Sequence, residues 1–139
     1  MLGIPLALYM DNMAETVKRL IMRKRDLESN EKLSKLQRFI LVALLESKYA
    51  AMSQKEFNQF IYNTWFRKYW AATAQASLSR TYKRLKARGF LSNNCKLTLA
   101  GSLMAYNVWH QCSREYLHEF DLKGPPPEVL QLLKAARRQ

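Results

Sequence analysis

The chain has 139 residues, of which 48% are hydrophobic and 12% aromatic, and it contains only four glycines and four prolines. This composition excludes a disordered polar chain, because enough apolar surface is present to offset the conformational entropy lost on folding. The length fits one domain over residues 1–139, mainly α, because sparse glycine and proline favour long helices.

The positive charge is concentrated in one part of the chain. Residues 57–114 contain nine basic residues and no acidic one, so most of the net charge of +12 lies there. Such a one-signed field costs self-repulsion unless a polyanion neutralises it, whereas a surface that serves solubility alone usually mixes both signs. The pattern therefore favours nucleic acid as the partner.

The first predicted element is an N-terminal helical arm over residues 11–32. Asp11 or Asn12 can cap it, and its apolar residues recur at helical spacing. The arm can pack on a second subunit or on its own domain. The preceding residues 1–10 are apolar but too short to span a bilayer and lack a basic leader, so we expect neither a signal peptide nor membrane contact.

Two core helices are predicted next. Ser53 and Glu56 form a capping-box pattern that opens the second of them, whose inward residues begin at Phe57. The first is indicated by a dense apolar stripe that consists of Leu33, Leu36, Phe39, Ile40, Ala43 and Leu44.

An unusual aromatic segment covers residues 62–70, with five aromatic and two basic side chains. Either the second core helix continues through it, or it forms an inserted turn over the core. Its rings could stack on bases, as in single-strand binders, but large aromatics beside a helical core are usually buried. We therefore favour core packing.

The next helix is predicted over residues 73–88, with Thr73 as its cap and Gly89 as its stop. At 100° per residue, Leu78, Tyr82 and Leu85 share an inward face. The opposite face carries Ala76, Arg80, Lys83 and Ala87. Small residues let a helix approach base edges, while Arg and Lys contact guanine or phosphate.

Residues 90–98 are predicted to form a hairpin of two short strands, 90–92 and 95–98. Asn93 and Asn94 lie between them, and asparagine tolerates the positive φ of a two-residue turn. A long helix follows from Thr98. After the proline-rich stretch 124–127, residues 128–134 predict a last short helix before a basic tail.

The stretch from Ala76 to Leu91, followed by Lys96-Leu97-Thr98-Leu99-Ala100-Gly101, resembles the recognition helix and wing of winged helix-turn-helix regulators of the MarR and PadR type. In that family a leucine-rich helix ends at glycine, a hydrophobic pair starts the wing, and a Leu-Thr-x-x-Gly run leads into the next helix. The likeness covers about half of the chain. It implies a winged helix-turn-helix core over residues 33–101, with a short two-stranded wing and extra N- and C-terminal helices.

The resemblance also implies a DNA-binding surface. The helix 73–88 would enter the major groove and the wing 90–98 would touch the backbone or an adjacent groove. The wing carries a single basic residue, which suits a phosphate clamp. The residues implied to contact DNA are Thr73, Gln75, Ser77, Ser79, Arg80, Lys83, Arg84, Asn93, Asn94 and Lys96.

Members of these families are typically dimers joined by helices outside the motif. Here the candidates are the arm and the C-terminal helices over residues 102–139, where Tyr106, Trp109, Tyr116, Leu117 and Phe120 add apolar surface. A two-fold dimer would place two recognition helices about 34 Å apart on a pseudo-palindromic site. The alternative is a monomer whose terminal helices fold back. A small-molecule effector would fit the resemblance, but no residue identifies one.

Catalytic and metal chemistry find little support. Cys95, Cys112, His110 and His118 lack the spacing of a metal site, and we expect them to be structural in a reducing cytoplasm. There is no glycine-rich phosphate loop and no evident nucleophile with a base partner. We therefore expect neither an enzyme nor a cofactor.

The sequence thus predicts a cytoplasmic, dimeric transcriptional regulator that binds duplex DNA sequence-specifically, with repression the expected mode. Two alternatives stay open. One is an RNA-binding or replication-associated winged-helix module, and the other is a protein-interaction module in which the helix 73–88 docks on an acidic partner.

Overall fold

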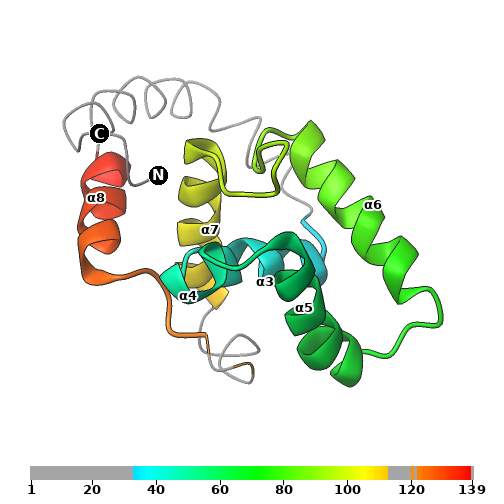
Figure 1. Cartoon of the computed structure of the whole chain (residues 1–139). Helices are drawn as coiled ribbons and strands as arrows, with labels where there is room; N and C mark the ends of the chain where they lie inside the picture. The colour runs from blue at the N-terminus through cyan, green and yellow to red at the C-terminus, as the bar shows by residue number, and fades with distance from the viewer. Residues whose placement is uncertain (1–32, 113–119, 121, 139) are drawn as a thin grey trace.

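The computed structural model describes residues 33–112, 120 and 122–138. The predicted N-terminal arm lies outside these residues, as do Tyr116 and Leu117 of the predicted C-terminal apolar surface. Figure 1 shows α3 near the centre of the described part, with α6 and α8 on opposite sides of it. The helices of this part are α3 (Lys35–Leu44), α4 (Ser47–Ala50), α5 (Gln54–Lys68), α6 (Ala74–Ala87), α7 (Leu99–Cys112) and α8 (Pro127–Arg138).

Helix α3 is the centre of the core. Ser34 caps it through a reciprocal contact with Gln37: Ser34 Oγ accepts the Gln37 N–H at 3.1 Å, and Gln37 Oε1 accepts the Ser34 N–H at 2.8 Å. The five consecutive residues from Phe39 to Ala43 are 0% exposed. The predicted stripe is therefore confirmed as core, but the helix is buried on every side and not along one face only. A helix that is apolar all round needs neighbours all round, and α4, α6 and α7 pack directly on it.

Most of the aromatic segment is a continuation of α5, which runs to Lys68; Tyr69 is its C-cap residue and Trp70 follows in the turn before α6. The capping box that opens α5 is confirmed, since Ser53 Oγ accepts the Glu56 N–H at 3.2 Å and Glu56 Oε1 accepts the Ser53 N–H at 3.3 Å. The ring of Phe39 joins α5 to α3, with its centroid 5.8 Å from that of Phe60 and 5.2 Å from that of Trp65.

The predicted two-stranded wing is wrong. Between residues 33 and 112 and in the described C-terminal residues there is no β-strand, and residues 90–98 form a loop with one isolated antiparallel bridge between Leu91 and Leu97. Two backbone hydrogen bonds flank the bridge, from Ser92 N–H to the Lys96 carbonyl at 2.8 Å and from Thr98 N–H to the Phe90 carbonyl at 3.1 Å.

The turn inside this 90–98 loop explains why no ladder forms. A two-residue hairpin turn needs positive φ at its central positions. Here the positive φ of 59° falls on Cys95 and on neither asparagine. The chain instead makes a β-turn closed by the Cys95 N–H and the Ser92 carbonyl at 2.9 Å, followed by the left-handed Cys95. This reversal takes up Cys95 as well as the two asparagines, and α7 begins at Leu99, so the pairing across it is limited to the single bridge of Leu91 and Leu97.

Thr98 joins the end of α6 to the start of α7. Its hydroxyl donates to the Gly89 carbonyl and accepts the Gly101 N–H at 3.0 Å, so Thr98 caps α7. Gly89, at φ 78°, ends α6 as predicted. Gly101 is packed so closely on the backbone of Phe90 that a Cβ would overlap the Phe90 carbonyl oxygen.

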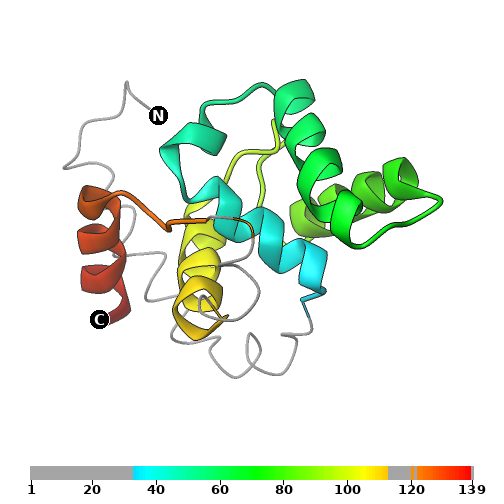
Figure 2. The same cartoon turned by 90° about the horizontal axis from the view of Figure 1, so that it is seen from below.

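The C-terminal helix is longer than predicted and packs on its own chain. Helix α8 begins at Pro127, where the missing N–H costs no helical hydrogen bond. It packs on α7 (Figure 2). Its residues Leu133 and Ala136 are buried. None of the described helices is both long enough and apolar enough to cross a membrane.

We expect Gly101→Ala to destabilise the fold by about 1–3 kcal/mol or more, because the new methyl group would press on rigid backbone of the 90–98 loop. Urea unfolding followed by circular dichroism measures the change in the free energy of unfolding. Gly89→Ala is the comparison: its Cβ meets open space and it suffers only the left-handed backbone, at about 1 kcal/mol. Equal losses for the two variants would contradict the close contact.

Candidate nucleic-acid interface

Helix α6 separates a core face from a solvent face, as its spacing predicts. Leu78, Tyr82 and Leu85 are buried. Ala76, Arg80, Lys83 and Ala87 are exposed. Thr73 occupies the N-cap position as predicted, but its side chain makes no capping hydrogen bond. The first N–H groups of α6 therefore receive no capping hydrogen bond from Thr73.

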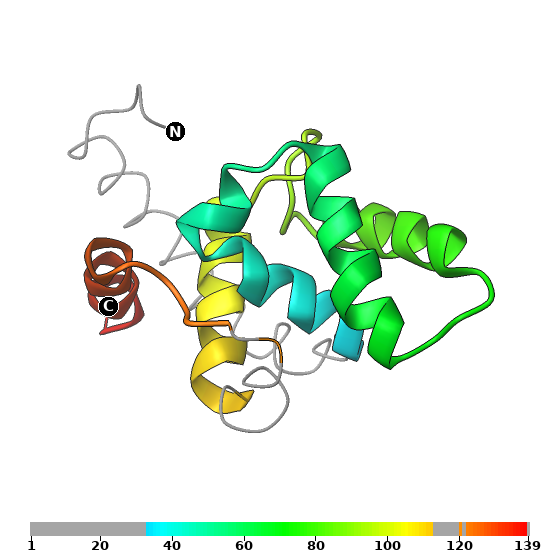
Figure 3. The ribbon, with the colours of Figure 1, turned by 60° about the horizontal axis from the view of Figure 1, so that its bottom comes forward.

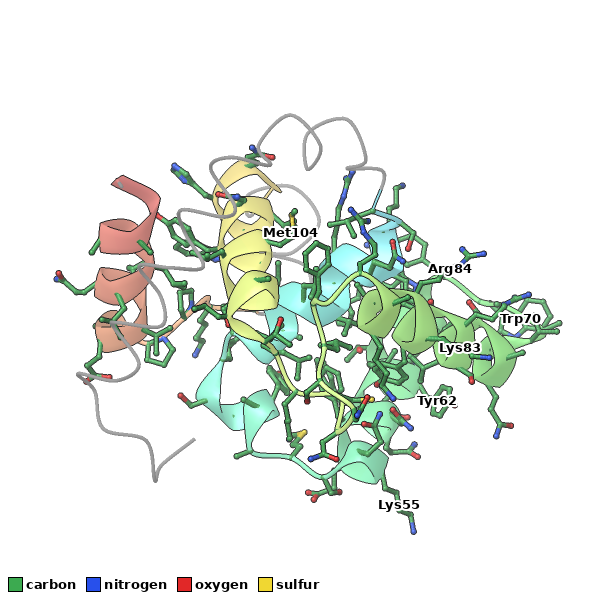
Figure 4. The ribbon with its side chains drawn as sticks, turned by 90° about the horizontal axis from the view of Figure 1, so that it is seen from above. Lys55, Tyr62, Trp70, Lys83, Arg84 and Met104 are labelled. Carbon is green, nitrogen blue, oxygen red and sulfur yellow. The ribbon has the colours of Figure 1, made fainter. Side chains whose placement is uncertain are left out.

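A groove opens between α6, the first turns of α5 and the 90–98 loop. Its volume is about 790 Å³. Five side-chain amides and two lysines line it, together with two tyrosines, so it is polar and positively charged. Figure 4 shows Tyr62 and Lys83 on this side of the molecule. The residues of this α5–α6 groove are Gln54, Asn58, Tyr62, Gln75, Leu78, Ser79, Tyr82, Lys83, Lys86, Asn93, Asn94 and Cys95.

The groove brings together half of the predicted DNA-contacting residues. Gln75, Ser79 and Lys83 approach it from α6, and Asn93 and Asn94 approach it from the loop. At 100° per residue, Arg80 and Arg84 lie on the other flank of α6, where both are exposed.

Two further predicted residues lie at the margins. Ser77 is half-buried and its carbonyl accepts the Thr81 hydroxyl at 2.8 Å, while Thr73 is exposed at the start of α6. The solvent surface of α6 therefore has a groove side and an arginine side, with Ala76 and Ala87 between them.

Sequence reasoning missed the contribution of α5 to the groove. Gln54 and Asn58 are four residues apart, and the Gln54 amide donates to Asn58 Oδ1 at 2.9 Å. That spacing is a usable signal for a polar face of α5, beside the apolar residues that predict its core packing. Lys86 was also missed, although it follows Lys83 by three residues on the same side of α6.

A hydrogen-bonded pair at the base of the groove joins α5 to α6. The Tyr82 hydroxyl donates to Asn58 Oδ1 at 2.7 Å. Burial raises the pKa of the Tyr82 phenol far above its ordinary value, and the charge of Cys95 adds to the shift. Tyr82 therefore stays a neutral donor and holds the two helices at the spacing that the groove requires.

Lys96 has a different position from the one predicted. Its ammonium donates to the Ala50 carbonyl at 2.6 Å and to the Met52 carbonyl at 2.8 Å. These carbonyls lie at the end of α4 and in the turn before α5. Lys96 thus connects the 90–98 loop to that turn, and its ammonium group donates hydrogen bonds to backbone oxygens of the same chain.

The positive charge of α6 is not neutralised by the acidic residues that the structure describes. Glu46 accepts the Lys123 N–H at 3.1 Å, and Glu56 belongs to the capping box of α5. Within the described ranges no ion pair reaches Arg80, Lys83, Arg84 or Lys86. The charged face of α6 is therefore open to an anionic partner.

The described residues hold no group of three or more His, Cys, Asp or Glu side chains placed to bind a metal ion. No protein-family model, curated protein or solved structure matches the chain. The likeness to MarR and PadR regulators therefore remains a prediction from the sequence of α6 and the residues that follow it.

We expect Tyr82→Phe to lower stability by about 1 kcal/mol at neutral pH, through loss of the bond to Asn58. Above about pH 10 the unfolded chain ionises Tyr82 and the folded chain does not, so the wild type loses up to about 1.4 kcal/mol per pH unit more than the variant. The free energies of unfolding of the two proteins, plotted against pH, should therefore converge and then cross as the pH rises. A gap that stays constant with pH would contradict the buried phenol.

We expect Lys96→Met to release the 90–98 loop, since its two backbone contacts disappear while the aliphatic stem is kept. The loss of stability should be about 1 kcal/mol, and hydrogen exchange at the Ser92 and Thr98 amides should speed up. Lys55→Met is the control, because Lys55 is exposed on α5 and has no described partner. Identical hydrogen exchange in both variants would show that the two hydrogen bonds of Lys96 do not hold the loop in place.

Proposed function

We propose that the protein binds duplex DNA with α6 in the major groove. The observation that carries this proposal is the solvent face of α6, where small side chains and unneutralised basic side chains alternate in a segment without acidic residues. Ala76 and Ala87 let the backbone of α6 approach the base edges, and Arg80 and Lys83 beside them supply donors to guanine and phosphate.

The α5–α6 groove supports the same orientation. Its amide side chains, which include Gln54, Asn93 and Asn94, are suited to phosphate and sugar contacts that position a protein on the duplex. Lys83 and Lys86 add charge beside them. The groove would then follow one strand while Arg80 and Arg84 follow the other. Figure 3 shows α5 and α6 running in different directions.

The biological role that we propose is transcriptional regulation by a cytoplasmic dimer, with repression as its mode. A dimer would present two α6 helices about 34 Å apart to a pseudo-palindromic site. Because Leu133 and Ala136 of α8 are buried within their own chain, these two residues would not take part in the dimer contact. Analytical ultracentrifugation of the full chain measures the oligomeric state directly.

We expect the double variant Arg80→Ala, Lys83→Ala to lower duplex affinity about ten-fold or more. The slope of log K against log salt should fall in magnitude by about 1–2, because binding releases fewer counterions from the DNA when phosphate contacts are lost. Fluorescence anisotropy with a labelled duplex, measured over a range of salt concentrations, gives both quantities. The fold should be unaffected, because both side chains are exposed.

Lys134→Ala is a control that removes one exposed positive charge from α8, which lies far from α6 in Figure 1. Loss of binding in both variants would indicate a general charge effect and not a site. Binding that does not depend on salt would contradict the proposal. A preference for double-stranded RNA would contradict the groove assignment, because the deep, narrow major groove of A-form RNA does not admit a helix.

A further inference from the structure

Trp70 stands apart from the rest of the aromatic segment. Trp65 and Phe66 are buried, and Tyr69 packs on Trp65 with ring centroids 4.5 Å apart. Trp70 is 80% exposed, and no other large apolar side chain among the described residues is exposed. No hydrogen bond or ring contact joins it to another described residue. The fold therefore gives no structural reason for a tryptophan at this position.

The position of Trp70 relates it to the proposed DNA-binding helix. It lies in the turn between α5 and α6, three residues before the N-cap Thr73. Figure 4 shows Trp70 at the outer edge of the molecule, beside the first turn of α6. Arg67 is exposed close by in the sequence, and no acidic residue occurs between residues 57 and 114.

We propose that Trp70 stacks on an unpaired base of the DNA that α6 holds. This inference rests on the proposed function. A broad apolar ring beside the exposed Arg67, in a segment of the sequence without acidic residues, is complementary to a nucleobase, which offers a π-face next to phosphates. An acidic protein partner would match the charge but gives no particular reason for the ring.

The stacking requires DNA of a particular kind. In an intact duplex the base faces are covered by their neighbours, so the Trp70 ring gains a partner only where a base is unpaired or extruded. The protein should therefore prefer a duplex that contains such a base. Because Trp70 is uncharged, its contribution should leave the salt dependence of binding unchanged, which separates it from Arg80 and Lys83.

The experiment compares two probes, a duplex of ~20 base pairs and the same duplex with one extra unpaired adenine at its centre. The wild type should bind the bulged probe about five-fold or more tightly than the intact one. Trp70→Ala should bind both probes equally and keep the wild-type salt slope. Trp70→Phe should keep part of the preference, since a smaller ring still stacks.

A second measurement reports on the ring itself. The emission of the wild type minus that of Trp70→Phe isolates Trp70, because Trp65 and Trp109 are present in both proteins. We expect this difference signal to be quenched by the bulged probe and less so by the intact duplex. This readout does not depend on how Trp70→Ala folds.

The outcomes separate the two proposals. Absence of salt-dependent binding to the intact duplex by the wild type would overturn the proposed function, and the stacking with it. Salt-dependent duplex binding without a preference for the bulged probe would overturn the stacking alone. A preference that persists in Trp70→Ala, or a Trp70 emission unchanged at saturating bulged probe, would do the same.

Discussion

The burial of α3 on all sides is the constraint on which the other elements depend. A helix with five consecutive residues out of contact with solvent is stable only if neighbours cover its whole circumference, because uncovered apolar surface costs about 25 cal/mol per Å². The ring of Phe39 contacts Phe60 and Trp65 of α5, while α6 and α7 cover other sides. Since α6 must turn its leucines towards α3, its charged and small residues necessarily face outward.

Individual hydrogen bonds hold the surroundings of α6 in place where a sheet was expected. Thr98 bonds the end of α6 to the start of α7, Lys96 bonds the loop to the turn before α5, and Tyr82 bonds α6 to α5. Each contact joins segments far apart in the chain or closes a turn that local structure leaves open. Together they place Asn93 and Asn94 beside Lys83, so the polar groove exists without a wing.

The basic and the aromatic residues of the acid-free segment 57–114 have separate roles in this arrangement. Most of the aromatic rings of residues 62–70 pack in or against the core, as expected for large aromatics beside a helical core. Helix α5 carries these residues as far as Lys68. The basic residues of α6 lie outside that core. Trp70 is the exception among the rings, because it falls after the last turn of α5, where the packing of the helix on α3 no longer reaches.

The sequence by itself determined the elements whose signals act within about four residues: the Ser53–Glu56 capping box, the stop of α6 at Gly89, and the separation of Leu78, Tyr82 and Leu85 from Arg80 and Lys83. It also determined the one-signed charge of residues 57–114. Only the tertiary structure decided that Asn58 meets Tyr82, that Lys96 reaches Ala50 and that the asparagine turn forms a loop and not a hairpin. The physical reason is distance along the chain. Periodicity and caps depend on residues that are close in sequence, whereas a groove depends on how segments distant in sequence pack around a shared core.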